Sequence, residues 1–146
     1  MRLTTRTNLA MRTLMFCAVN TDRTVRTSEI AEKCNASENH LGQVINTMGH
    51  NGFVTTVRGR GGGIRLALEP ADISVGHVMR VFESSAPFAE CFQKDGGDCP
   101  ILPHCRLRGK FVSALEAFYA TLDDVTLLDL VKDNTGLVQL FTPELA

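Results

Sequence analysis

The sequence lacks the long apolar run and the targeting segment that mark membrane and secreted proteins. None of its apolar stretches approaches the roughly 20 residues that a membrane-spanning helix needs. Residues 1–6 carry charges but no apolar block or small-residue cleavage site, so we do not expect a signal peptide. There is also no internal repeat or low-complexity tract. The 146 residues therefore predict one ordinary domain-sized core in a cytoplasmic protein.

Paired Cys-x-x-Cys motifs are absent as well, although the chain contains five cysteines. Zinc ribbons depend on such pairs. In the reducing cytoplasm, we expect the thiols to be free or metal-bound rather than joined as disulfides. A catalytic cysteine would need a nearby base such as His104, but no Cys/His/Asn constellation with a pocket can be drawn from the sequence. We therefore do not expect an enzyme.

The formal net charge of −1 conceals an uneven distribution along the chain. Residues 1–65 hold nine Lys and Arg against four Asp and Glu, whereas residues 66–146 hold six against twelve. Charge varies along any chain, so this observation carries little weight alone. It is consistent with a front half that meets a polyanion.

Apolar periodicity and turn residues predict a winged helix in the front half. Thr27 or Ser28 is suited to cap the second helix and Ser37 the third. A short turn between these two helices makes a helix-turn-helix, and a β-hairpin with a basic, glycine-rich tip follows it at once. The predicted helices and strands cover residues 8–19, 29–34, 38–51, 53–57 and 64–68.

The third predicted helix has the composition of a DNA recognition helix. Its apolar residues recur on one face, which leaves a polar face of Asn and Gln side chains that can bond adenine edges in the major groove. The wing adds arginines suited to phosphates or a narrow minor groove. Polar outer faces are often merely solvated, so the prediction depends on the order of helix, turn, helix and wing. The expected DNA contacts are Thr27, Ser28, Ser37, Asn39, His40, Gln43, Asn46, Arg58 and Arg60.

The back half predicts a helix over residues 75–83, a long loop over 84–103 and a helix over 104–122. Loops of this length are usually functional or disordered. The helix over 104–122 is too apolar along one stripe for a domain this small to cover, so we expect it to pack on its mate in a dimer. The chain thus divides into a winged-helix domain over 1–83, the loop over 84–103, the dimerisation helix, and a C-terminal helix and tail over 123–146. The fold class is mainly α with a small β-hairpin.

Three cysteines, Cys91, Cys99 and Cys105, lie in and just after the long loop, separated by seven and then five residues. Three thiolates this close in sequence favour a soft metal. An iron–sulfur cluster held by only three cysteines would leave one iron with a weak or exchangeable ligand, which suits a sensor. A structural zinc module is the alternative from another class. Cys17 and Cys34 fall on apolar helix faces and are expected in the core.

The whole chain up to about residue 133 resembles the Rrf2 family of bacterial winged-helix regulators. Four features carry the resemblance: the opening Met1-Arg2-Leu3-Thr4, the wing over 57–66, the stretch Ile73-Ser74-Val75-Gly76, and the three-cysteine loop. The resemblance implies a homodimer and a palindromic double-stranded DNA operator. It also implies an iron–sulfur cluster, 4Fe–4S or 2Fe–2S, held by the three cysteines.

Three branches of the family compete for this chain. The recognition-helix residues 38–46 and the stretch 126–131 resemble the nitric-oxide-sensing repressors. The cluster-biogenesis branch places a histidine ligand where this chain has Arg108, which disfavours it. The iron-responsive branch shares the cysteine spacing and resembles this chain at Asn8, where nitric-oxide sensors carry an aspartate that reaches the partner subunit's cluster. Asn8 is therefore a candidate fourth ligand, alongside Glu90, His104, a thiol or water.

The predicted function is a dimeric transcriptional repressor whose cluster senses nitric oxide and controls genes of nitric-oxide detoxification or nitrogen-oxide metabolism. Loss of the cluster lifts repression. The alternative is a repressor that responds to iron limitation through loss of the same cluster.

Overall fold

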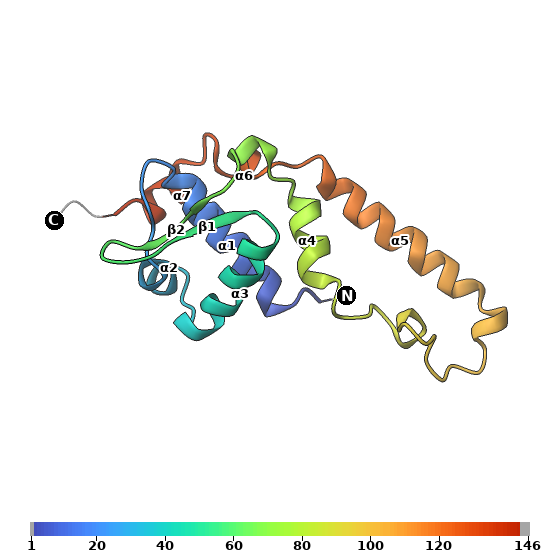
Figure 1. Cartoon of the computed structure of the whole chain (residues 1–146). Helices are drawn as coiled ribbons and strands as arrows, with labels where there is room; N and C mark the ends of the chain where they lie inside the picture. Colours follow the sequence, from blue (N-terminus) through green and yellow to red (C-terminus); the bar gives the residue numbers. More distant parts are fainter. Residues whose placement is uncertain (1, 144–146) are drawn as a thin grey trace.

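Seven α-helices and one β-hairpin make up the described part of the chain, residues 2–143 of the computed structural model (Figure 1). The elements are α1 (Thr5–Val19), α2 (Thr27–Lys33), α3 (Glu38–His50), β1 (Val54–Val57), β2 (Gly63–Leu66), α4 (Val75–Glu83), α5 (Arg106–Asp123), α6 (Leu127–Val131) and α7 (Thr135–Phe141), with short 3-10 turns η1 (Pro70–Asp72), η2 (Glu90–Phe92) and η3 (Leu102–His104). The fold is thus mainly helical with one small hairpin, as predicted. No helix among these residues is long and apolar enough to cross a membrane.

Helix α1 is the centre of the body, because α3, α4, α6 and α7 all pack against it. It begins at Thr5, three residues before the predicted start, because the Thr4 hydroxyl caps it by accepting from the Thr7 backbone N–H at 3.3 Å. Leu14 and Phe16 are almost fully buried in the core that these helices enclose. Burial of such side chains stabilises the fold by about 1.5–3 kcal/mol each.

The helix-turn-helix forms as predicted, but α2 starts differently. Thr27 and Ser28 are its first two residues rather than its cap, and Arg26 occupies the cap position. The Glu29 carboxylate accepts the Arg26 backbone N–H at 3.2 Å. A side chain of the helix itself therefore bonds a free N–H group at the start of α2. Asn35 then takes a left-handed φ of 49° and reverses the chain. The Ser37 hydroxyl caps α3 as predicted, accepting from the His40 backbone N–H at 3.2 Å.

The wing is an antiparallel pair in which Val54 lies opposite Leu66 and Val57 opposite Gly63. The connection between α1 and α2 adds a bridge on its other edge, because Val25 and Ile64 exchange two main-chain hydrogen bonds of 3.0 and 2.8 Å. A Cβ on Gly63 would lie 2.7 Å from the Val25 carbonyl carbon. Only glycine permits this close approach, which fixes the base of the wing to the body.

Helices α4 and α5 carry the chain away from the body and back again (Figure 1). Helix α4 has its predicted bounds, with Ser74 as its cap. Helix α5 begins at Arg106 rather than at residue 104, because His104 belongs to a 3-10 turn and Cys105 is the cap residue. None of the α5 residues is buried.

The C-terminal helices return to the core of the body. Leu127 on α6 is 0% exposed, and the ring of Phe141 on α7 lies 5.0 Å from that of Phe16. Helix α6 is the one C-terminal helix predicted within residues 123–146, whereas the second helix there, α7, was not predicted. The tail therefore shares its apolar core with α1.

Candidate functional site

The outer face of α3 presents the polar side chains that the sequence assigned to DNA. Asn39, His40, Gln43 and Asn46 are all exposed, whereas Leu41 and Val44 on the opposite face are 0% exposed. The Asn46 carbonyl contacts the His50 ring nitrogen Nδ1 at 2.7 Å, so His50 folds back onto its own helix. The exposed Asn and Gln side chains of this face can bond base edges.

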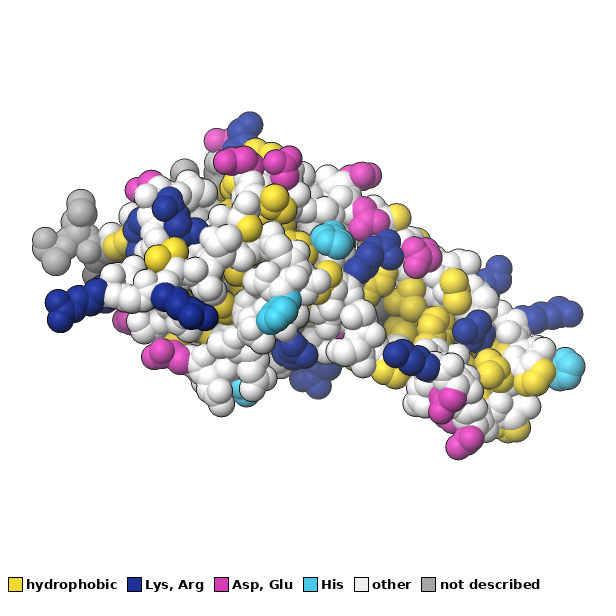
Figure 2. Space-filling view, viewed as in Figure 1, with side chains coloured by type: hydrophobic (Ala, Val, Ile, Leu, Met, Phe, Trp, Pro, Cys, Tyr) yellow, Lys and Arg dark blue, Asp and Glu magenta, His cyan; other side chains and the backbone are white. Residues whose placement is uncertain are grey.

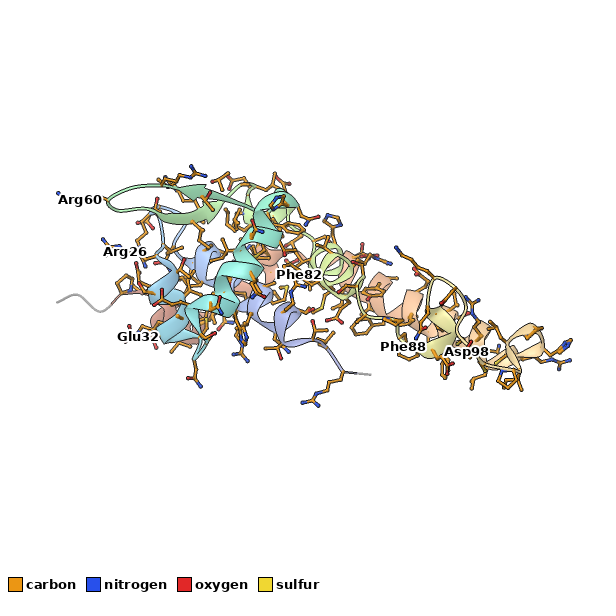
Figure 3. The ribbon with its side chains drawn as sticks, turned by 60° about the horizontal axis from the view of Figure 1, so that its bottom comes forward. Arg26, Glu32, Arg60, Phe82, Phe88 and Asp98 are labelled. Atoms are coloured by element: carbon orange, nitrogen blue, oxygen red, sulfur yellow. The ribbon has the colours of Figure 1, made fainter. Side chains whose placement is uncertain are left out.

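The tip of the wing holds two exposed arginines, Arg58 and Arg60. Figure 3 shows Arg60 at the far end of the hairpin. Gly59 and Gly61 take φ values of 97° and 77°, which side chains rarely adopt. The glycines therefore let the tip turn tightly while both arginines point into solvent, where phosphates can reach them.

The start of α2 adds a third part to this surface. Ser28 is exposed and Thr27 is half-buried. Arg26, which precedes them, is also exposed, and it was not among the predicted DNA contacts (Figure 3). Its position at a helix start could have identified it, because helix N-termini attract phosphates and an arginine strengthens that attraction. The Lys and Arg side chains on this part of the molecule are visible in Figure 2.

Three of the five cysteines lie on the segment between α4 and α5, residues 84–105, which we call the cysteine loop. Cys91 is in η2, Cys99 precedes η3, and Cys105 is the cap residue of α5. All three are half-buried free thiols. Figure 3 shows the loop, marked by Phe88 and Asp98, at the opposite end of the molecule from Arg60.

The cysteine loop is folded on itself by two glycines. Gly96 and Gly97 take φ values of 81° and 64°, and a Cβ on Gly97 would lie 2.7 Å from Glu90 Cγ. The Asp98 backbone N–H donates to the Glu90 carboxylate at 3.1 Å. These contacts hold the segment around Cys99 against the segment that carries Cys91.

Arg108, in the first turn of α5, ties Cys91 to the helix that Cys105 caps. Its Nε donates to the Cys91 carbonyl at 3.1 Å, and its guanidinium lies 5.2 Å from the centre of the Phe92 ring. The residue that takes the place of a histidine ligand thus has a structural role. It brings the first and third cysteines of the loop to the same end of α5.

The donor chemistry of the loop fits an iron–sulfur cluster, since such clusters are held by cysteine thiolates. The three thiols are not joined in disulfides with one another, are partly accessible, and lie on one loop. Within residues 2–143, however, no three His, Cys, Asp or Glu side chains lie together in a way that could hold a metal ion. The loop would have to close further for its three thiols to share one cluster.

Cys17 and Cys34 are core residues, as predicted, at 2% and 6% exposed. Burial raises the pKa of the Cys17 thiol to about 12. Burial also raises the pKa of the Cys34 thiol. Both side chains therefore stay protonated near neutral pH, and protonated thiols are poor metal ligands and poor nucleophiles.

Asn8, the candidate fourth ligand, lies on the first turns of α1. It is exposed, and its amide donates to the Thr4 carbonyl at 3.4 Å. The first turn of α1 is itself held by Glu83, whose carboxylate accepts the Thr4 backbone N–H at 2.9 Å. Nothing in the sequence pattern singles out Glu83, because its partners are almost eighty residues away.

Comparison with known proteins finds relatives that match nearly the whole chain. The family model of Rrf2, described as iron-dependent transcriptional regulators, matches residues 3–133. The HTH-type transcriptional regulator NsrR of Geobacillus kaustophilus is 41% identical over 141 residues, which are 96% of each chain.

Two solved structures share the fold. CymR, the global cysteine regulator of B. subtilis, is 25% identical with a TM-score of 0.70, covering 90% of this chain and 96% of its own. IscR of T. potens is 29% identical with a TM-score of 0.70, covering 91% of this chain and 88% of its own. The similar proteins are winged-helix transcriptional regulators and not enzymes.

Proposed function

Because the chain belongs to the Rrf2 family of transcriptional regulators, we propose that it is a repressor whose iron–sulfur cluster senses nitric oxide. The similarity to the transcriptional regulator NsrR over nearly the full length supports the regulatory role. The resemblance of residues 38–46 and 126–131 to nitric-oxide-sensing repressors supports the signal. The observation that carries the proposal is the cysteine loop, which presents three half-buried free thiols at the start of an exposed helix.

In this proposal, Cys91, Cys99 and Cys105 hold the cluster and Asn8 of the partner subunit stands near its open position. When bound, the cluster supplies iron that nitric oxide can attack. The protein's own contribution is to orient the thiols, through the Gly96–Gly97 turn and Arg108. An amide oxygen is a weaker iron ligand than the carboxylate found in related sensors, so the fourth position is open to exchange.

The proposed assembly is a homodimer on a palindromic operator. Helix α5 supports it, because Leu107 is 57% and Val112 39% exposed, and the half-buried Phe111 and Leu115 lie on the same helix. Figure 2 shows apolar side chains gathered along α5 and beside the cysteine loop. Exposed apolar side chains gathered in this way commonly mark a surface that binds another protein. Two bodies related by a two-fold axis would present their α3 helices to successive major grooves.

On the DNA, α3 supplies base contacts through Asn39, His40, Gln43 and Asn46. Arg58 and Arg60 contact the backbone or the minor groove, and Thr27, Ser28 and Ser37 bond to phosphates. Most of the affinity comes from the phosphate contacts and most of the sequence preference from α3. The genes that this repressor is proposed to control serve nitric-oxide detoxification or nitrogen-oxide metabolism.

Anaerobic purification of the full chain tests the proposal. We expect a brown protein that binds its operator, and stoichiometric nitric oxide should bleach it and release the DNA. Cys91→Ala, Cys99→Ala and Cys105→Ala should each abolish cluster retention, whereas Cys17→Ala and Cys34→Ala should retain it. A colourless protein with about one zinc per chain would exclude any sensor role.

The same preparation distinguishes the iron-responsive alternative, which the family description as iron-dependent favours. Mild iron chelation that releases the DNA, together with a slow response to nitric oxide, would identify iron as the signal. Rapid bleaching by nitric oxide at constant iron would identify nitric oxide.

A further inference from the structure

Glu83 is the last residue of α4, immediately before the cysteine loop, and its carboxylate is hydrogen-bonded to the start of α1. Its Oε1 accepts the Thr4 backbone N–H at 2.9 Å, the Thr4 hydroxyl at 3.1 Å, and the hydroxyl of Thr7. Thr7 is 0% exposed. Hydrogen bonds to a carboxylate are about twice as strong as neutral ones, so three donors on one oxygen make a firm joint.

This joint lines a cavity of about 320 Å³ whose other walls belong to the cysteine loop and α5. Thr4 and Glu83 form one side, and Phe88 and Phe92 of the loop form another. Figure 3 shows Phe82 on α4 and Phe88 on the loop beyond it. Because Phe92 directly follows Cys91, a rearrangement at that cysteine moves a wall of the cavity that Glu83 also lines.

The other side of the same α1 turn bonds to the recognition helix. Arg6 donates from Nη2 to the Thr47 hydroxyl at 2.9 Å, and that hydroxyl donates to the Gln43 carbonyl at 3.1 Å. Gln43 is one of the exposed α3 residues expected to read bases. The first turn of α1 thus contacts both the end of α4 and the outer part of α3.

We propose that Glu83 is a positioning residue that couples the cysteine loop to α3 through the first turn of α1. The inference rests on the proposed sensor function, because it assigns a route by which that signal reaches the DNA surface. A signal at one site changes affinity at another only if some contact differs between the two states. The Glu83 joint is suited to be that contact, because the packed body beneath it is rigid and the cavity beside it leaves room for movement.

Four variants of the full chain isolate the joint. Glu83→Gln removes the charge at nearly constant shape, and Thr7→Val removes one donor at nearly constant volume. Thr7→Ser keeps the hydroxyl and is the conservative rescue. Glu69→Gln is the matched control, because Glu69 is exposed and accepts no side-chain hydrogen bond from any of residues 2–143.

Hydrogen exchange of the metal-free protein provides a readout that does not depend on a bound cluster. In Glu83→Gln and Thr7→Val, we expect the amides of Thr7 and Asn8, which bond to Thr4, and those of residues 43–47 to exchange about tenfold faster, equivalent to about 1.4 kcal/mol. Thr7→Ser and Glu69→Gln should match the wild type. Faster exchange that stops within α1 and leaves α3 unchanged would overturn the proposal.

Operator affinity with and without the cluster provides the second readout. We expect the wild type and Glu69→Gln to lose affinity about tenfold or more on cluster removal. In Glu83→Gln and Thr7→Val that ratio should fall toward one while the cluster absorbance is retained. An unchanged ratio in these two variants would overturn the coupling alone. A wild-type ratio of one would overturn the sensor function and the coupling together.

Discussion

Arg80 and Asp123 join the middle of α4 to the last residue of α5, with Nη2 and Oδ2 2.9 Å apart. The same guanidinium lies 4.5 Å from the centre of the Tyr119 ring. The Ser74 hydroxyl donates to the Asp123 carbonyl at 2.9 Å. These contacts fix the angle at which α5 leaves the body, and that angle sets how far the cysteine loop lies from α3.

The tight approach of α4 and α5 gives the first prediction. A Cβ at Gly76 would lie 2.6 Å from the Asp123 backbone nitrogen, so Gly76→Ala must force the two helices apart. We expect a loss of about 1–3 kcal/mol in the free energy of unfolding, measured by chemical denaturation. A Cβ at Gly136 would meet no atom of residues 2–143 within 4 Å, so Gly136→Ala should be neutral or stabilising by up to about 1 kcal/mol. Equal stability of the two variants would contradict the crowding.

Thiol reactivity gives the second prediction. In metal-free native protein at pH 8, iodoacetamide should alkylate Cys91, Cys99 and Cys105 and spare Cys17. The reason is that only thiolates react readily, and burial raises the pKa of Cys17 to about 12. Mass spectrometry should find Cys17 modified only after unfolding in urea. Native labelling of Cys17 at the rate of the loop cysteines would contradict its place in the core.

The wing gives the third prediction. Arg60→Ala should weaken operator binding and lower the slope of log affinity against log salt by about one for each wing, because a phosphate contact is lost. Gln43→Ala should instead reduce the preference for operator over random DNA and leave the slope unchanged. Lys132→Ala, which removes the same charge at the end of α6, is the control. If Lys132→Ala and Arg60→Ala change the salt slope equally, the wing makes no specific contact with the DNA.

The packing of α7 gives the fourth prediction. Phe141 is 4% exposed and its ring contacts Phe16, so Phe141→Ala should cost about 3–5 kcal/mol of unfolding free energy. Its neighbour Leu140 is 52% exposed, and Leu140→Ala should change stability by less than about 0.5 kcal/mol. Thermal unfolding of the two variants measures the difference. Similar midpoints would show that α7 does not belong to the core.

The start of α6 gives a prediction of pH dependence. Hydrogen bonds from the Thr126 backbone and hydroxyl lower the pKa of Asp129 below its usual value. Because the folded state prefers the charged form, Asp129 stabilises the fold above the usual pKa of about 4 and loses that effect as the pH falls through the lowered pKa.

Asp129→Ala should therefore be less stable than the wild type at neutral pH, and the gap should narrow in acid below about pH 4. Denaturation midpoints at several pH values measure it. Glu69→Ala serves as the control for a general effect of removing one surface acid. A gap that does not change with pH would mean that Asp129 acts only through helix propensity.

The parts of the fold that could be predicted are those set by local chemistry. Helix α4 has a serine cap and apolar residues at one-face spacing, so its bounds follow from the sequence. Helix α2 does not follow the usual rule, because Glu29 supplies the cap contact that Thr27 or Ser28 was expected to make. Helix α7 has weak periodicity, and its formation depends on the contact of Phe141 with Phe16, which no local pattern reveals.

The candidate site divides in the same way. Cys91, Cys99 and Cys105 could be found from their spacing and loop context. The sequence showed only that Arg108 stands where one branch of the family has a histidine ligand. Its hydrogen bond to the Cys91 carbonyl became visible only in the structure. Glu83 could not be found at all, because its role arises from two residues, Thr4 and Thr7, that the fold brings from the other end of the chain.

The excursion formed by α4, the cysteine loop and α5 leaves and rejoins the body at neighbouring points. Val75 donates to the Val125 carbonyl and Leu127 to the Ile73 carbonyl, both at 2.8 Å. This segment is therefore an insertion that can evolve separately from the winged helix. Its residues can be lengthened, shortened or exchanged while the two main-chain hydrogen bonds at its base hold the DNA-binding domain together. The same winged helix could then be combined with insertions that respond to different signals. A chimaera of this protein that carries a relative's insertion should still bind the operator of this protein.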